Sequence, residues 1–499
     1  MKFFAVAPIL FLAGFTAGAQ TNLTATASRS MSLTDCIQEA LQHNLDVQIE
    51  RYDPQVSLYN LNAAYGGYDP TFNFSGEHDH NVQPGQIQEN GLVLPSTTTD
   101  GASFNSSLGG STPWGLQYSL NGNVADRTFT TPGAGSVENS GGSIGINLTQ
   151  PLLKNFWIDN TRLNIRVAKN RLKFSEQGLR EQIITSATAV MNAYYELVFA
   201  FENVKVQQQA LELAQTQLDQ DKQRVQIGTL AQLDVQQDEA QVASSRANLI
   251  TAQSTLNTDQ NTLKNLLTDD YVKWHDVDIQ PSETLTAPLQ LFDLQDSWSK
   301  GMTERPDLLQ ARLNVEQAGI QLKFFRNQLF PELDLIGTYG FNGASKEYSG
   351  VFGEFADRNS PFYSYGAQLS VPLASVNTRN QYKSSKATMQ QVALQLKQLE
   401  QNVMVEIDNA VKTAQSAYQS VDATRQARIY AEAALDAEQK KYAVGKSTTF
   451  TVLQLQNSLT TARSNEIRAL ADYNEALANL AAQEGSTLER NGIDVSVTR

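Results

Sequence analysis

The sequence predicts a mainly α-helical protein with a small antiparallel β part, built from two copies of a unit of helix, strand pair and long helical hairpin. No proline occurs from Leu152 to Gln280 or from Leu373 to Arg499, and long proline-free runs permit long helices. Each run has a glycine near its middle, Gly228 or Gly445. Glycine favours the left-handed turn that ends a helix, so each run is expected to fold back on itself there.

The spacing of matching residues indicates a duplication. The two central glycines lie 217 residues apart (445 − 228). Pro70 and Pro331, which each precede a segment of alternating apolar and polar residues, lie 261 residues apart (331 − 70). Because the order of segments is the same in both halves, the chain is expected to contain one structural unit twice.

Composition and the first residues indicate an exported protein that does not bind nucleic acid. The net charge is −14, and no dense patch of lysine and arginine is present that could neutralise phosphates. Residues 1–19 are predicted to be a secretory signal peptide, with Lys2 before an apolar core and Ala17-Gly18-Ala19 as the cleavage site. The single cysteine, Cys36, has no partner for an internal disulfide and is expected to be a small buried residue.

The elements can be placed along the chain from their periodicity. Helical spacing of apolar residues is clearest after Pro372, where a near-3.5 repeat typical of coiled coils begins. Strand alternation is clearest after Pro70 and Pro331. The predicted segments are leading helices at 31–69, strands and loops at 70–151, a first hairpin at 152–267, an intermediate segment and second leading helix at 268–330, strands at 331–372, a second hairpin at 373–485, and a tail at 486–499.

Within the first strand region, long polar loops are expected at about 81–100 and 127–141. The segments 104–110 and 116–124 also have strand character. They either extend a long hairpin beyond a shared sheet or add a second strand pair to it. The shorter second strand region is expected to hold one strand pair with a loop between its strands.

The sequence contains no pattern of residues that predicts an enzyme, a cofactor site or a metal site. His78 and His80 could share one face of a strand, but further ligands are missing, and an exposed loop is the simpler interpretation. Glu332 and Asp334 are interpreted as solvated carboxylates rather than as an acid–base pair. No glycine-rich phosphate loop, cysteine cluster or nucleophile elbow occurs.

Taken together, these motifs resemble the TolC family of outer-membrane channel proteins. The resemblance rests on the duplicated order of segments, on Leu148-Thr-Gln-Pro-Leu-Leu153 and its copy Leu369-Ser-Val-Pro-Leu373, on Arg305-Pro-Asp-Leu308, and on the two glycine tips. It implies a homotrimer with a shared β-barrel in the outer membrane and a tube of helices extending into the periplasm. For this barrel we expect 12 strands, with 18 as the alternative.

The resemblance also implies function and partners. The protein would be the outer-membrane channel of a tripartite efflux or type I secretion system, a passive duct embedded in outer-membrane lipid. Its partners would be a periplasmic adaptor protein and an inner-membrane transporter. The adaptor would dock at the hairpin tips, which comprise Ile227, Gly228, Thr229, Val444, Gly445 and Lys446.

The family's periplasmic gate is matched only in part. Asp234 and Tyr442 correspond to a tyrosine–aspartate tie between the two tips, and Asp234 could equally serve as a helix N-terminal cap. Ser447 stands where the family has an arginine, and Thr451 and Gln454 stand where it has a ring of aspartates. We therefore expect a gate closed by weaker polar contacts and a pore that cations block less.

Two other functions remain open from the sequence. A periplasmic adaptor would have one hairpin beside a small β-domain, without duplication of the whole unit. A surface coiled-coil stalk would place the strands outside the cell. Neither would conduct ions across a bilayer.

Overall fold

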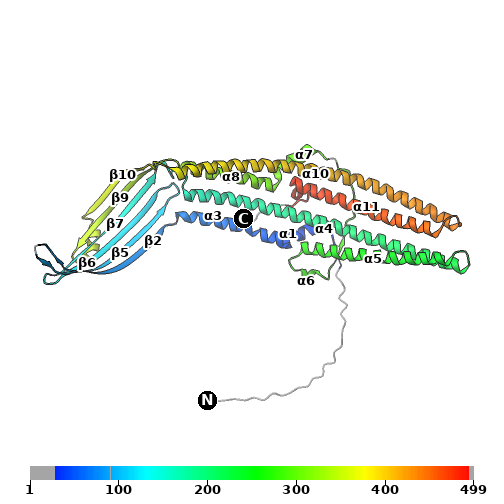
Figure 1. Cartoon of the computed structure of the whole chain (residues 1–499), viewed down its shortest axis with the longest axis horizontal. Helices are drawn as coiled ribbons and strands as arrows, with labels where there is room; N and C mark the ends of the chain where they lie inside the picture. Colours follow the sequence, from blue (N-terminus) through cyan, green and yellow to red (C-terminus); the bar gives the residue numbers. More distant parts are fainter. Residues whose placement is uncertain (1–27, 90, 291, 494–499) are drawn as a thin grey trace, which may run out of the picture.

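The protein is elongated, with a β-sheet at one end and two helical hairpin tips at the other (Figure 1). The structure is a computed structural model and describes residues 28–89, 91–290 and 292–493. The predicted signal peptide lies outside the described residues. Among the described residues, no helix has both the length and the apolar character needed to cross a membrane.

Six long strands form one antiparallel sheet in the order β10-β9-β7-β6-β5-β2. Four come from the first half of the chain and two from the second: β2 (Thr71–Gln83), β5 (Thr97–Ser111), β6 (Gln117–Thr131), β7 (Gly135–Pro151), β9 (Glu332–Ser345) and β10 (Pro361–Ser370). A separate small hairpin pairs β3 (Gln86–Ile87) with β4 (Val93–Leu94).

The expectation of four sheet strands per chain was therefore wrong. Strand β5 pairs along its length with both β2 and β6, so the extra segments join the sheet rather than extending beyond it. Most of the loop expected at 127–141 is strand, because β6 and β7 meet at a tight turn around Gly133. Strand β2 continues through His78 and His80, which are exposed on a strand and not in a loop.

The two faces of the sheet differ in chemistry. One face carries a row of apolar side chains that crosses all six strands in register, at Phe72, Leu108, Leu120, Ile146, Tyr339 and Tyr363. The next row on the opposite face is small and polar, at Thr71, Gly109, Ser119, Asn147, Thr338 and Ser364. These six residues are 36–73% exposed, so this row has no covering layer within the chain.

A short helix, α9 (Tyr348–Asp357), occupies the connection between β9 and β10, where a loop was expected. Val351 of this helix is fully buried against the sheet. Tyr348, Phe352 and Phe355 recur at helical spacing and contact one another as edge-to-face pairs. A helix of only 10 residues between two strands gives too short a periodic pattern to be distinguished from a loop in the sequence.

Four long helices form two hairpins: α4 (Asn160–Gln226) with α5 (Gln232–Leu267), and α10 (Val376–Ala443) with α11 (Thr449–Glu484). Helix α4 has 67 residues, which corresponds to about 100 Å at 1.5 Å per residue. It begins at Asn160, within the hairpin predicted at 152–267, because the Asp159 side chain caps it by accepting from the Arg162 amide at 2.8 Å.

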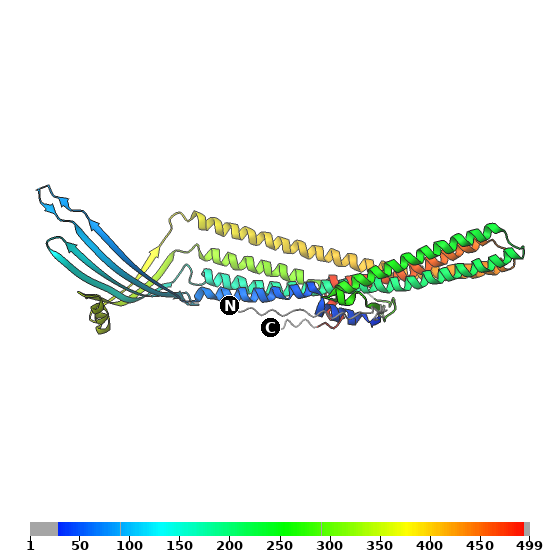
Figure 2. The same cartoon turned by 90° about the horizontal axis from the view of Figure 1, so that it is seen from below.

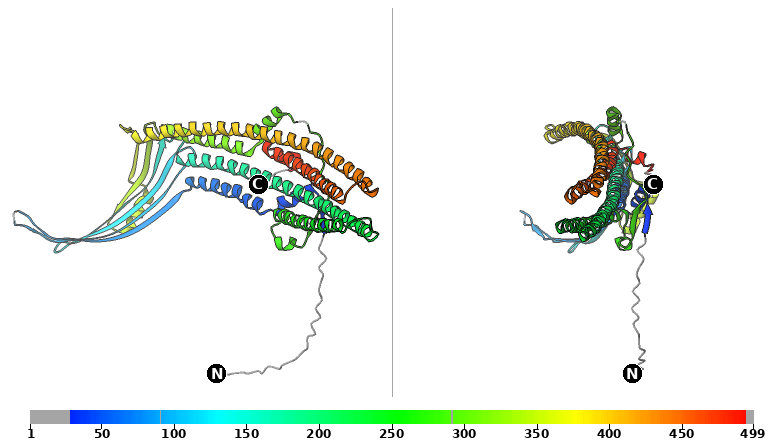
Figure 3. Two further views of the ribbon diagram at one scale, coloured as in Figure 1. Left: turned by 45° about the vertical axis from the view of Figure 1, so that its right-hand side comes forward. Right: turned by 90° about the vertical axis from the view of Figure 1, so that its right-hand side faces the viewer.

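Two shorter helical segments extend the hairpins toward the sheet. Helix α3 (Tyr52–Tyr65) packs on α4 and leads through the 3-10 turn η1 (Gly66–Tyr68) into β2, while α8 (Pro306–Asn327) packs on α4 and α10 and precedes β9. Seen along the long axis, the helices lie on an arc (Figure 3). The duplication predicted from the sequence is therefore present as helix, strands and hairpin in the same order in each half.

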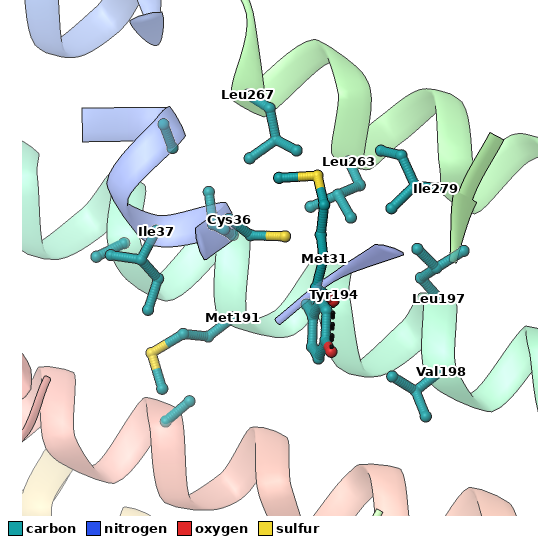
Figure 4. Close-up of a cluster of buried hydrophobic side chains, with 14 residues drawn as sticks. Met31, Cys36, Ile37, Met191, Tyr194, Leu197, Val198, Leu263, Leu267 and Ile279 are labelled. Atoms are coloured by element: carbon teal, nitrogen blue, oxygen red, sulfur yellow. Dashed lines mark hydrogen bonds between the residues drawn. The ribbon is translucent and has the colours of Figure 1, made fainter. Parts of the chain in front are cut away.

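A belt of short elements lies against the outside of the helical arc, near the middle of the helices (Figure 2 and Figure 3). It comprises the parallel strands β1 (Ser28–Met31) and β8 (Asp278–Pro281) with α1 (Leu33–His43), α2 (Leu45–Glu50), α6 (Tyr271–Trp274), α7 (Leu294–Glu304) and α12 (Thr487–Arg490). In its core, Cys36 and Ile279 lie on either side of the Met31 side chain, and the Tyr194 hydroxyl of α4 donates to the Met31 carbonyl oxygen at 3.2 Å (Figure 4). Burial raises the pKa of the Cys36 thiol to about 12, so this cysteine is an inert buried residue, as expected.

Candidate functional site

The two hairpin tips lie together at the end of the molecule opposite the sheet (Figure 2). Gly228 and Gly445 have φ angles of +77° and +75°, the left-handed conformation that closes each turn. In both tips the residue after the glycine donates its amide hydrogen five residues back, from Thr229 to Arg224 and from Lys446 to Lys441, at 2.9 Å. The duplicated unit therefore ends in the same turn twice.

Each tip presents apolar side chains to solvent, with Leu233 and Phe450 exposed in the first turn of each return helix. Ile227 is 73% exposed and Val444 is 67% exposed, and each directly precedes its glycine. A Cβ atom added to either glycine would meet no other atom. The two tips are thus matching exposed turns at the ends of long helices.

Behind the tips, two aspartates are buried between the hairpins. Asp221 of α4 and Asp238 of α5 are both 0% exposed, and the charge of Asp221 acts on the Asp238 carboxyl group. Tyr442 of α10 donates its hydroxyl hydrogen to Asp221 Oδ2 at 2.7 Å, and Gln217 donates to the same oxygen at 2.7 Å. Both carboxylate oxygens of Asp238 lack a donor among the described residues.

One cation and one further hydroxyl complete this buried cluster. The Arg224 guanidinium lies 3.5 Å from Asp221 Oδ1 and 4.5 Å from the centre of the Tyr442 ring. The Thr449 hydroxyl of α11 shares a 2.9 Å hydrogen bond with the Tyr442 hydroxyl. The cluster therefore links all four long helices next to the tips.

Burial, with Asp221 nearby, raises the pKa of Asp238 to about 7. An ionised carboxylate that is buried without a donor is disfavoured, so Asp238 holds a proton up to about pH 7, far above the range of an exposed aspartate. The proton can then be donated to Asp221, which removes the repulsion between the two groups. Burial also raises the pKa of the Tyr442 hydroxyl, so that it stays a hydrogen-bond donor.

The partner of Tyr442 within the chain differs from the one expected. Asp234 lies in the first turn of α5, where a carboxylate is favoured by the helix dipole, while Tyr442 bonds to Asp221 instead. The N-terminal cap of α5 is Ala231, so Asp234 is not itself the cap residue. Asp221 lies two helical turns before Gly228, and this spacing is the pattern that could have identified it.

The other gate candidates lie around the second tip. Ser447 donates to Glu438 Oε1 at 2.5 Å and, together with Lys441, lowers the pKa of that carboxyl. The Thr451 amide is capped by the Thr448 hydroxyl at 3.3 Å. Gln454 lines a shallow hollow between α10 and α11. Each of these three residues therefore makes neutral or local contacts within the chain.

Over the part of the chain that the structure describes, no group of three or more histidine, cysteine, aspartate or glutamate side chains is placed to hold a metal ion. His80 is paired with Asp100 on the neighbouring strand. The functional candidates are consequently the two tips, the buried cluster behind them and the sheet.

Comparison with known proteins identifies the family. Residues 36–268 and 299–486 match the family model described as outer membrane efflux protein. The chain is 25% identical to the outer membrane protein TolC of Escherichia coli over 315 residues, which is 62% of each protein, and 25% identical to TolC of Vibrio cholerae over 365 residues, which is 71% of this chain and 79% of that protein.

A solved structure supports the same fold. The structure of VceC from Vibrio cholerae, described as an outer membrane protein, superimposes with a TM-score of 0.65 at 18% identity, covering 91% of this chain and 96% of that one. The likeness includes the long hairpins as well as the sheet, since almost the whole chain is covered. The chain therefore belongs to the outer membrane efflux protein family.

Proposed function

We propose that three copies of this chain form a passive channel that crosses the outer membrane and continues into the periplasm as a helical tube. The observation that carries the proposal is the six-stranded sheet, whose apolar face is covered only at one end, by α9, and whose edge strands β2 and β10 are exposed. Unpaired backbone groups have no water partners in a bilayer, so β2 of one copy pairs with β10 of the next. Three copies of six strands give a barrel of 18 (3 × 6), within the range of known barrels.

The height of the apolar face fits a membrane. On β9 it extends from Leu333 to Gly343, and beyond Gly343 the same face becomes polar, at Ser345 and its neighbours Ser140 and Asp126. Ten residues span about 33 Å along a strand, and a tilt of roughly 40° reduces this to about 25 Å. This is the height of the apolar band of outer-membrane barrels.

We propose that cargo passes through the lumen unchanged. The inner face of the sheet is lined by small polar side chains, such as Asn121 and Ser119, which bond to each other at 2.9 Å. Such a surface suits a water-filled passage. In the helical part, three arcs of the kind seen in Figure 3 would close into a tube that continues the lumen.

The channel proposal is tested by purifying the protein in detergent, measuring its native mass and recording single-channel currents after reconstitution into a planar bilayer. We expect a trimer that dissociates only on heating and that conducts. A monomer without current would contradict the proposal and would leave a periplasmic adaptor or a surface stalk as the function.

We further propose that the tips dock a periplasmic adaptor protein that connects the channel to an inner-membrane transporter. Ile227 and Val444 are the apolar contacts, and the flanking residues Gly228, Thr229, Gly445 and Lys446 shape the turns. Two relatives are named as efflux or export proteins, BepC of Brucella suis and OpmQ of Pseudomonas aeruginosa, which supports a role in export.

The docking proposal can be tested by placing a photo-activated cross-linking residue at Ile227 or Val444 in living cells. We expect each position to cross-link to a periplasmic adaptor. The control is Leu394, which is 68% exposed on α10 but distant from the tips. If Leu394 captures the same adaptor as efficiently as the tips do, the tips are not the docking site.

A further inference from the structure

The short helix α9 lies on the apolar face of the sheet. The ring of Tyr348 at its start is 6.0 Å from the ring of Phe104 on β5. Further along, Val351 O and the Phe355 ring lie 2.9 and 3.0 Å from where a Cβ atom on Gly343 of β9 would stand. The helix therefore crosses the strands from β5 to β9 and rests on a glycine. Figure 2 shows α9 on the same side of the molecule as the belt helices.

This position coincides with the end of the apolar band. The row on which α9 rests is Gly76, Phe104, Val124, Gly142 and Gly343. One row further from the helices, the same face carries His78, Ala102, Asp126 and Ser140. The hydroxyl of Ser140 donates to Asp126 at 2.7 Å. The helix thus lies across the boundary between apolar and polar surface.

The outer side of α9 is aromatic and uncovered. Phe352 is 51% exposed, and its ring lies 5.6 Å from Tyr348 and 6.3 Å from Phe355. Charged, exposed residues stand at both ends of the helix, with Lys346 and Glu347 before it and Asp357 and Arg358 after it. An aromatic centre between charged ends is typical of a helix that lies in a membrane interface.

We propose that α9 is an interfacial helix that lies flat in the outer leaflet, with Phe352 among the upper acyl chains and its charged ends among the headgroups. The occupant of its exposed face is lipid, because that face is continuous with the apolar band that contacts lipid in the proposed channel. The inference rests on that proposed function. Helix α9 thus adds a contact with the outer leaflet to the contacts that the strands make with lipid.

The test uses a Cys36→Ala background, since Cys36 is the only native cysteine. A bimane fluorophore is attached to F352C, and the trimer is placed in vesicles whose lipids carry bromine on the upper acyl chain. We expect at least twofold quenching at 352, comparable with L120C in the middle of the band. The labels at D357C, on the end of α9, and at E138C, beyond the band, are expected to be quenched little.

The outcomes separate the two proposals. Quenching at 120 without quenching at 352 overturns the interfacial helix and leaves the channel intact. Quenching at neither position means that the sheet does not contact lipid, and the proposed channel fails. A Gly343→Val variant adds an independent check, because the new side chain would displace α9; quenching at 352 should then fall while quenching at 120 persists.

Discussion

At the scale of single residues, the buried cluster behind the tips joins groups that are distant in the sequence. Asp221 and Tyr442 are 221 positions apart, yet their side chains meet at 2.7 Å. Asp238 adds a carboxyl group that can be tolerated there only with a proton. The cluster is therefore sensitive to pH in a way that the exposed ion pairs on the same helices are not.

The stability of the tip region should fall as the pH rises from about 4 to about 7. Asp238 has a folded pKa of about 7 against an unfolded value of about 3.9. The folded state thus holds the extra proton in this window, and each pH unit favours local opening by up to roughly tenfold. Asp221, Asp234 and Arg224 are the other charged groups that face the site.

Deuterium exchange of residues 217–242, corrected for intrinsic rates, measures this opening. Asp238→Asn keeps the group neutral, so we expect its exchange to be nearly independent of pH. Asp219→Asn changes an exposed residue of α4 two positions before Asp221, and its exchange should retain the pH dependence. An unchanged pH dependence in Asp238→Asn would show that another group is responsible.

The tip glycines give a second prediction at this scale. Gly445 has a φ of +75° and open space around its missing Cβ, so Gly445→Ala should cost only the backbone strain, about 1 kcal/mol. We expect faster deuterium exchange at the amides of Gly445 and Lys446, which close the turn. Gly319→Ala, at a helical position in α8 with equally open space, should instead be neutral or slightly stabilising.

At the scale of elements, Arg305 is the junction of α8 with the second hairpin. Its guanidinium donates to Asp307 at 3.0 and 2.7 Å, to Glu406 at 2.7 Å and to the Gln483 side chain at 2.8 Å. Its side chain is only 12% exposed. The Arg-Pro-Asp-Leu motif noticed in the sequence thus joins three helices, α8, α10 and α11.

Arg305→Ala should destabilise this junction by roughly 2 kcal/mol, because charge-assisted hydrogen bonds are lost and two carboxylates are left without their partner. Thermal unfolding followed by circular dichroism measures the loss. Lys412→Ala removes an exposed pair with Asp408 on α10, and surface pairs of this kind contribute little. Equal effects of the two substitutions would mean that Arg305 acts as one more surface charge.

Elements could be predicted from the sequence where residues close together in the chain determine them. The long helices and the tips followed from proline-free runs, apolar periodicity and glycine. The strands β5 and β6 were recognised, but their place in the sheet was not, because alternation reveals a strand and not its neighbours. Helix α9 was missed because Tyr348, Phe352 and Phe355 form only two turns between strands.

At the scale of the whole molecule, the channel should respond to cations differently from one with carboxylates at its narrow end. Thr451 and Gln454 stand where the family resemblance places aspartates, and both are neutral. We expect the conductance of the reconstituted channel to persist at micromolar concentrations of a trivalent cation. The combined variant Thr451→Asp and Gln454→Asp should be blocked, since a trimer would then hold a ring of carboxylates. Collapse of the parent's conductance would contradict the prediction of a weakly charged gate.

The sequence by itself determined the duplicated unit, the long hairpins, the two glycine tips and the resemblance to the family. These depend on local rules, such as proline exclusion and helical period, that act within a few residues of one chain segment. Only the tertiary structure decided that six strands share one sheet, that Tyr442 reaches Asp221, and that α9 crosses the apolar face. Each of these is a contact between segments far apart in the chain, and its energy depends on which surfaces meet, which periodicity alone does not encode.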